Sequence, residues 1–185
     1  GVVENSSLER IVGRLNGSKS FLDERLNFET QLTASRVTNE TAPLSGSAGF
    51  QGDLLGAAYS ANPTWPTSIE GLSQEDQTAI IGGQLHPGNM LENISNESIT
   101  DRFLGNISAS YEIADGLTAK VLYALDRAES DAFSMVTENI RGFNNGTPNN
   151  GRGAWNTLGI TNNLFEATVS YNGDFGNSSL EVVGG

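Results

Sequence analysis

Between Phe103 and Arg127 the sequence reads FLGNISASYEIADGLTAKVLYALDR and alternates strictly between two kinds of residue. Up to Ile113 the odd positions are Phe, Gly, Ile, Ala, Tyr and Ile, whereas the even positions are Leu, Asn, Ser, Ser and Glu. After Asp115 and Gly116 the alternation restarts at Leu117, which predicts two β-strands joined by a tight turn. Both strands exceed the five or six residues typical of soluble sheets. Such strands either cover a soluble core or cross a membrane with the apolar face against lipid.

Two further hairpins are predicted from the same pattern, at residues 10–36 and 163–185, in addition to the one at about 102–127. In the first hairpin, apolar residues alternate with polar ones on both sides of a short turn at 22–25. Lys19 interrupts the apolar face near the end of its strand. In the third hairpin, the alternation from Phe165 to Tyr171 is followed by a turn within 172–178 and a sixth strand.

Two long connections separate these hairpins, at about 37–100 and 129–162, and both are polar and rich in Gly, Asn and Pro. We expect them to be loops, because such composition marks turns and irregular structure. Loops of this length inside an ordered protein are commonly functional. Short turns at one end of the strands and long loops at the other are typical of a transmembrane β-barrel.

Short helices are expected inside the first long connection. One would begin with Asp53 as its N-cap and end at Asn62-Pro63. Another would begin at Ser73, where the sequence SQED resembles a capping box, and would end before Gly82-Gly83.

The two faces of the predicted strands differ in chemistry. Aromatic residues lie near the short-turn ends, where an aromatic girdle would meet the membrane surface: Phe21, Phe28, Tyr111, Tyr171 and Phe175. The alternative is that these aromatics fill a soluble core. The opposite face carries mostly Asn, Ser, Thr and Gln, which suits a crowded, hydrated interior such as a plugged barrel lumen.

Composition excludes several kinds of function. The 185 residues contain 10 basic and 22 acidic residues, for a formal charge of −12, so a nucleic-acid partner is not expected. There is no cysteine, which excludes disulfides, thiol catalysis and cysteine-ligated metals. No apolar run is long enough for a membrane helix, but a barrel strand places only every second residue against lipid.

Few residues suggest catalysis or metal binding. His86 is the only histidine and precedes Pro87, so we expect it to be a loop residue rather than part of a metal site or a hydrolytic triad. Asp126, Glu129 and Asp131 lack the pattern of a calcium loop, and we expect a solvated acidic patch. The glycine-rich stretch from 142 to 153 has no phosphate-binding lysine. We therefore predict no enzyme activity, no cofactor and no metal.

Trp65 and Trp155 are the two candidate binding residues, because each falls in a long predicted loop. A flat indole ring can stack on the C–H face of a pyranose sugar. The alternative is that each tryptophan anchors its own loop or contacts a protein that covers the mouth of the barrel.

The chain resembles the SusC/RagA-like TonB-dependent outer-membrane transporters of Bacteroidetes. The resemblance rests on five stretches in order: GSKSFLDERLNFETQLTASR, GDLLGAAYSANPTWP, HPGNMLE, TDRFLGNISASYEIADGLTAKVLYALD and NNLFEATVSYNGDFGNSSLEVVGG. It covers nearly the whole chain and is weakest at residues 1–9 and 130–155.

The resemblance implies an all-β fold, an antiparallel up-and-down transmembrane β-barrel. About six long strands of this chain would form part of a wall of about 22 strands, with short helices in the long loops. It also implies import of oligosaccharides or peptides across the outer membrane, with a SusD-like surface lipoprotein as a lid. Energy would come from the TonB complex, acting through a plug domain inside the barrel.

Several parts of such a transporter are not recognisable in this sequence, including a plug, a TonB box and a signal sequence. We therefore expect a piece of a larger transporter, which by itself would transport nothing. An alternative from another class is a soluble extracellular β-sandwich or adhesin module that binds carbohydrate through its loops.

Overall fold

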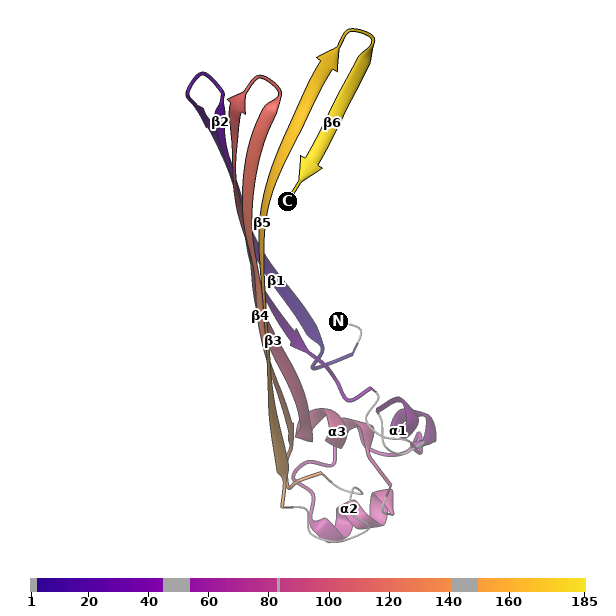
Figure 1. Ribbon diagram of the computed structural model, residues 1–185. Helices are drawn as coiled ribbons and strands as arrows, with labels where there is room; N and C mark the ends of the chain where they lie inside the picture. The colour runs from indigo at the N-terminus through magenta and orange to yellow at the C-terminus, as the bar shows by residue number, and fades with distance from the viewer. Residues whose placement is uncertain (1–2, 45–53, 83, 141–149) are drawn as a thin grey trace. The chain divides into compact units, whose positions relative to one another are not determined.

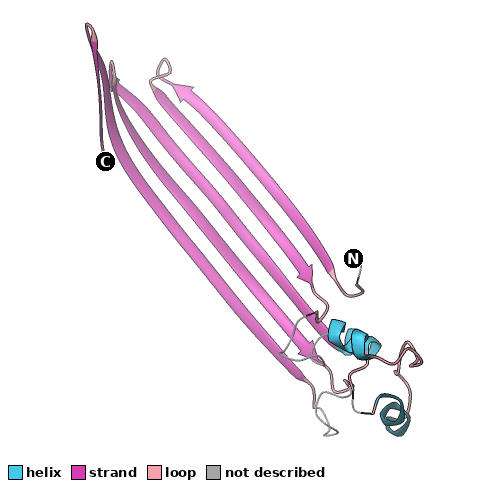
Figure 2. Ribbon diagram, turned by 90° about the vertical axis from the view of Figure 1, so that its right-hand side faces the viewer, coloured by secondary structure: helices cyan, strands magenta, loops and turns pink. Residues whose placement is uncertain are grey.

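A computed structural model describes residues 3–44, 54–82, 84–140 and 150–185. The six strands form one antiparallel sheet in which each strand lies beside its neighbours in sequence, in the order β1-β2-β3-β4-β5-β6 (Figures 1 and 2). The strands are β1 Ser7–Phe21, β2 Leu26–Glu40, β3 Ile94–Ala114, β4 Leu117–Val136, β5 Arg152–Phe175 and β6 Ser178–Gly184. The three helices are α1 Leu54–Ser60, α2 Gln74–Ile81 and α3 Pro87–Asn93. The predicted all-β character, the three hairpins and the short helices in the first connection are confirmed, and the sheet is not closed.

The tight turns differ in how the backbone reverses. Gly116 has a φ of 78°, and a Cβ on it would lie 2.1 Å from the carbonyl oxygen of Asn172, so glycine is required there. The β1–β2 turn contains no glycine. Leu22, Asp23 and Glu24 have φ values of 56°, 52° and 68°, a left-handed conformation that L residues adopt at an energetic cost. The turn is closed by a hydrogen bond from Arg25 N to Leu22 O of 3.2 Å.

The strands extend further into the predicted loops than the sequence indicated. The range 37–100 contains the end of β2 and the start of β3, and the range 129–162 contains the end of β4 and the start of β5. These extensions mix polar residues with a few apolar ones such as Phe133, Trp155 and Ile160, and their alternation is less regular than in the three hairpins. Backbone pairing holds them instead, as in the bonds from Thr41 N to Asn96 O and from Thr137 N to Asn93 O, both of 2.9 Å.

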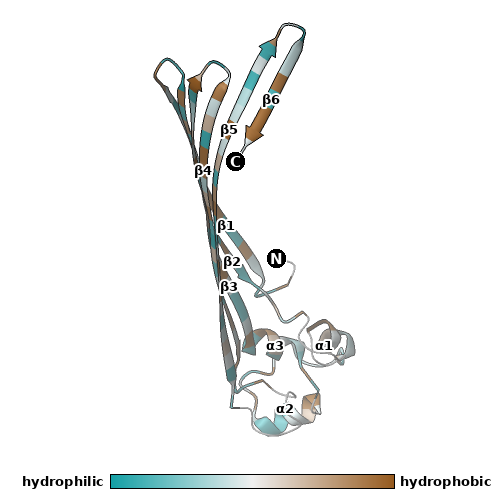
Figure 3. Ribbon diagram, viewed as in Figure 1, coloured by the Kyte–Doolittle hydropathy of each residue, from teal (hydrophilic) through white to brown (hydrophobic). Residues whose placement is uncertain are grey.

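Helix α2 begins and ends as predicted. The Ser73 hydroxyl accepts a hydrogen bond from Asp76 N at 3.1 Å, and Gly82 closes the helix in the left-handed conformation with a φ of 55°. Figure 3 shows its first turn as hydrophilic and its last as hydrophobic. The predicted N-cap of α1, Asp53, lies outside the described residues, as does Gly83.

Helix α3 was not predicted, because HPGNMLE was expected to be loop. Pro87 occupies the first turn, where its missing N–H costs nothing, and His86 is the N-cap. Histidine is not among the usual capping residues, so the sequence rules for helix starts do not identify this one. No helix among the described residues is both long enough and apolar enough to cross a membrane.

The chain divides into two compact units. We call Gly1–Glu9, Val37–Ile99 and Asp131–Thr157 the loop unit, because it contains all three helices. We call Arg10–Arg36, Thr100–Ser130 and Leu158–Gly185 the strand unit, because it contains the three tight hairpin turns.

The buried apolar side chains of the described residues all lie in the loop unit. Most form one cluster, in which α1 packs against α3: Ala42, Leu54, Ala57, Leu85, Met90, Ile94, Val136 and Ile140. Among the described residues of the strand unit, no apolar side chain is buried. The loop unit therefore has a hydrophobic core of its own.

Candidate functional site

Many large apolar side chains of the strand unit are exposed. Four contacts between neighbouring strands fix which residues share a face of the sheet, because side chains alternate along a strand. They are Phe21 with Phe28, Arg36 with Asp101, Arg102 with Asp126, and Tyr123 with Asn163. For β5 and β6 the register itself pairs Tyr171 with Val182 and Gly173 with Leu180.

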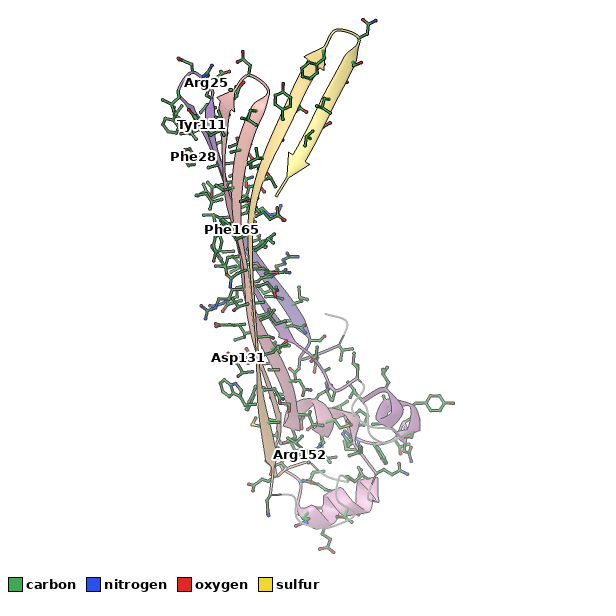
Figure 4. All side chains as sticks on the ribbon, viewed as in Figure 1. Arg25, Phe28, Tyr111, Asp131, Arg152 and Phe165 are labelled. Atoms are coloured by element: carbon green, nitrogen blue, oxygen red, sulfur yellow. The ribbon has the colours of Figure 1, made fainter. Side chains whose placement is uncertain are left out.

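By this criterion most of the exposed large apolar residues of the strand unit lie on one face. They are Ile11, Leu15, Phe21, Phe28, Phe103, Ile107, Tyr111, Ile113, Val121, Tyr123, Phe165, Val169, Phe175, Leu180 and Val182. All six strands contribute to this apolar face, so it is continuous across the sheet. Figure 4 places Phe28, Tyr111 and Phe165 on the same side of the ribbon.

The apolar face is long in the direction of the strands. On β3 it runs from Phe103 to Ile113, and about eleven residues at about 3.4 Å each span about 37 Å along the strand. At the tilt of about 45° usual for barrel strands, this becomes about 26 Å, close to the apolar band of outer-membrane barrels. Short hydrophobic and hydrophilic stretches follow one another along β5 and β6 in Figure 3, as alternating faces require.

Ion pairs border this apolar face on the side away from the hairpin turns. Arg36 donates two hydrogen bonds to Asp101, of 2.8 and 2.7 Å, just before Phe103 begins the apolar stretch. Arg127 pairs with Glu129 on β4. The hydrogen bond from Arg36, together with its charge, lowers the pKa of the Asp101 carboxyl. Charged pairs are expected where an apolar band gives way to water.

The predicted aromatic girdle residues lie at the opposite border, near the hairpin turns. Phe21 ends β1 and Phe175 ends β5, while Phe28 and Tyr111 lie within a few residues of their turns. Phe21 and Phe28 meet edge to face, with ring centroids 6.0 Å apart and an interplanar angle of 83°. None of these aromatics is in a buried core, because no apolar side chain of the described strand unit is buried.

The other face is mostly polar but not entirely so. It carries Asn27, Gln31, Asn106, Ser108, Ser110, Thr118 and Lys120, as the sequence predicts. Arg102 pairs there with Asp126 through two hydrogen bonds of 2.9 and 2.8 Å. The large apolar residues on this polar face are Val12, Leu104, Leu122, Leu158, Ile160, Leu164 and Val183. Two of them, Leu158 and Ile160, lie in the part of β5 that was predicted to be loop.

The two tryptophans have different environments. Trp65 lies in a loop as predicted, is half-buried, and stacks on His86 with centroids 5.8 Å apart and planes at 29°. Its contacts match the alternative that it anchors its own loop. Trp155 does not lie in a loop, because it belongs to β5. It is 69% exposed, meets Phe133 edge to face at 6.1 Å, and its Nε1 lies 3.5 Å from Oδ1 of Asp131.

Trp155 therefore remains a candidate for contact with a ligand or a partner. A rigid strand position and a neighbouring carboxylate hold its ring with most of its surface open. Thr157 also donates a hydrogen bond to Asp131, of 2.7 Å, so the carboxylate is fixed between the two side chains. Among the described residues Trp65 stacks on His86 whereas Trp155 meets Phe133, so the two tryptophans do not form one site.

The acidic residues considered for calcium do not converge. Asp126 lies on the polar face with Arg102, whereas Glu129 pairs with Arg127 and Asp131 holds Trp155. The described residues contain no group of three or more His, Asp or Glu side chains placed to hold a metal. Most of the glycine-rich stretch from 142 to 153 lies outside the described residues.

A polar pocket in the loop unit was not predicted. Its volume is about 230 Å³, and it is lined by Glu70, Gly71, Leu72, Gln77, Asn89, Asn93 and Asn139. Gln77, Asn89 and Asn93 are buried, and Asn93 Nδ2 donates to Asn89 O at 3.0 Å. The pocket joins residues about 70 positions apart, and only the fold brings them together. An unusual density of Asn and Gln in a predicted loop is the one sequence signal that points to it.

No protein-family model matches the chain, and no curated protein matches it.

Proposed function

We propose that this chain is part of the wall of an outer-membrane β-barrel that imports nutrients. The observation that carries the proposal is the apolar face of the strand unit, which is continuous over six strands and about 26 Å high at the usual tilt. Soluble monomers rarely expose contiguous apolar patches larger than a few hundred Å². In lipid, such an apolar face is stable without another protein surface to cover it.

The polar face supports the same proposal, because a barrel needs one face for lipid and one for its interior. Arg102 and Asp126 neutralise each other there, and amides and hydroxyls fill most other positions. An interior lined in this way accommodates water or a plug domain. Leu104, Leu122 and the three apolar residues of β5 would then contact the plug rather than water.

Six strands are fewer than the eight of the smallest known membrane barrels, and an open edge in lipid leaves backbone groups without partners. Further strands must therefore complete the wall. The resemblance to SusC/RagA-like transporters supplies the rest of the proposal: about 22 strands, a plug driven by TonB, a SusD-like lid, and an oligosaccharide or peptide as cargo. The residues of this chain would line the barrel and position its cargo, without acting as an enzyme and without a cofactor.

The soluble sandwich hypothesis requires a second sheet packed about 10 Å from the first. The described residues form one sheet, and its apolar face in the strand unit is exposed. No specific observation favours this alternative.

The test uses spin labels in the natural polypeptide that carries these residues, measured in isolated outer membranes. The 185 residues contain no cysteine, so Val121→Cys and Gln31→Cys each introduce one label site on this chain. We expect the label at 121 to collide more with dissolved oxygen, which concentrates in lipid, than with a water-soluble nickel chelate. The label at 31, on the polar face, should not show this preference.

The mass and terminal sequences of that polypeptide are measured first, and a length several times 185 residues is expected. Equal collision rates at the two sites, or release of the protein by alkaline carbonate without detergent, would overturn the membrane assignment. Import is tested separately by deleting the gene and growing cells on single glycans or peptides as carbon source. Unchanged growth on every one of them would overturn the transport assignment alone.

A further inference from the structure

His86 joins two segments of the loop unit through both nitrogens of its ring. Nδ1 accepts a hydrogen bond from the backbone N–H of Asn89, at 3.2 Å, and so caps α3. Nε2 lies 2.8 Å from the carbonyl oxygen of Pro66. A carbonyl oxygen can only accept a hydrogen bond, so Nε2 must carry the proton. A backbone N–H can only donate one, so Nδ1 must be unprotonated. Only the neutral imidazole with its proton on Nε2 satisfies both bonds.

The segment around Pro66 is closely packed on the first turn of α3. His86 is 3% exposed and stacks on Trp65. A Cβ on Gly88 would lie 2.3 Å from the carbonyl oxygen of Thr67, so only glycine permits this approach. Ser68 donates a hydrogen bond of 2.7 Å to Glu92, further along α3. These contacts hold the segment against α3 together with the His86–Pro66 bond.

A proton on Nδ1 would disrupt this arrangement. The N–H of Asn89 would then face another N–H, and the cap of α3 would be lost. The positive charge would also lie at the N-terminal end of a helix and away from water, where it is disfavoured. The carboxylates on α3 and on the segments packed against it are Glu4, Glu70, Glu92 and Glu138, and within the described residues none of them forms an ion pair with the imidazole.

We propose that His86 is a pH-sensitive latch whose protonation releases the segment 65–72 from α3. The closed form requires the neutral imidazole, so uptake of a proton by the ring favours the open form. The polar pocket has Glu70, Gly71 and Leu72 on the released segment and Asn89 and Asn93 on α3. Opening the latch therefore opens the pocket. This holds for the loop unit whether or not the strand unit lies in a membrane.

The test is hydrogen–deuterium exchange of the full chain between pH 7.5 and pH 5, corrected for the intrinsic pH dependence of exchange. Protection of the amides in 65–72 and 86–90 should fall as the pH falls, by at most about tenfold per pH unit, which is the limit when one proton is taken up on opening. In His86→Asn, a good N-cap that cannot titrate, protection in these segments should be independent of pH. Helix α2, which caps itself through Ser73, is the internal control.

Trp65 gives a second readout that does not require the His86→Asn substitution. In Trp155→Phe, Trp65 is the only tryptophan of the chain, and its emission should shift to longer wavelength over the same pH range. Loss of protection in α2 to the same extent would indicate general unfolding and overturn the latch. So would pH-independent exchange in the parent chain, or an imidazole that becomes protonated while Trp65 keeps its emission.

Discussion

Two isoleucines on one strand summarise the contrast between the two units. Ile94, at the start of β3 in the loop unit, is 8% exposed and packs in the core cluster. Ile107, further along the same strand in the strand unit, is 52% exposed. In the loop unit apolar side chains cover one another, as they do in water-soluble proteins. In the strand unit the large apolar side chains are not buried, and most of the exposed ones lie on one face of the sheet. The contrast teaches that one strand can carry buried apolar side chains where helices pack with it and exposed ones elsewhere.

The largest expected effect is on the free energy of unfolding, from a substitution in the core of the loop unit. Met90 has no exposed surface and sits in the main cluster, so Met90→Ala should lower the free energy of unfolding of this unit by about 2–5 kcal/mol. Hydrogen exchange of α1 and α3 under increasing urea measures this loss of stability. Leu55→Ala, at an exposed position of α1, should change stability by less than about 0.5 kcal/mol. Similar effects of the two substitutions would show that the loop unit has no real core.

The next prediction tests whether the apolar face of the strand unit is surrounded by lipid or by water. Val121→Arg puts a charge in the middle of the apolar face and should destabilise the inserted protein by about 2–4 kcal/mol. Gln31→Arg, on the polar face, is the matched control and should be tolerated better. Ser108 looks like an equivalent control by sequence, but it is buried, so an arginine would be crowded there for a different reason. Urea titrations in lipid vesicles measure both variants, and equal losses would contradict the assignment of faces.

A smaller gain is expected in the β1–β2 turn of the strand unit. Glu24 has a φ of 68°, which costs an L residue about 1–2 kcal/mol relative to an unstrained conformation. Glycine has no such cost, so Glu24→Gly should stabilise the hairpin by about 1 kcal/mol, since its greater freedom when unfolded offsets part of the gain. Exchange of the β1–β2 amides reports the change. Loss of protection there would mean that the turn does not adopt the left-handed conformation.

The smallest effect concerns the border of the apolar face. The pKa of Asp101 is lowered by Arg36, so the pair stabilises the folded state above the carboxyl's unfolded pKa, and this contribution is lost as the pH falls through the folded pKa. In Arg36→Gln, the carboxyl resonance of Asp101 in NMR should titrate at higher pH than in the parent. The pair is largely exposed, so the shift should shrink in high salt. An unchanged titration would mean that the pair does not form.

The sequence predicted the strand unit and the loop unit to different extents. In the strand unit, strict alternation located all three hairpins, because each face has a constant environment over many residues. In the loop unit, Ser73 and Gly82 marked α2, since caps are local signals. Local signals did not find α3, whose cap is a histidine, nor the parts of β3, β4 and β5 within the long connections, where alternation is irregular and strands pair with their neighbours. Nor did they find the pocket or the contact of Trp65 with His86, which only the tertiary fold creates.

The strand order has a consequence for how such a sheet can be made and altered. Every strand pairs only with strands adjacent in sequence, so no connection crosses another. Each hairpin can form by itself and then dock on the one before it, which keeps the search short despite the long strands. A hairpin could also be duplicated or lost without reversing the direction of any remaining strand. The long connections would stay on the same edge, and a sheet of this design can change its size by two strands at a time.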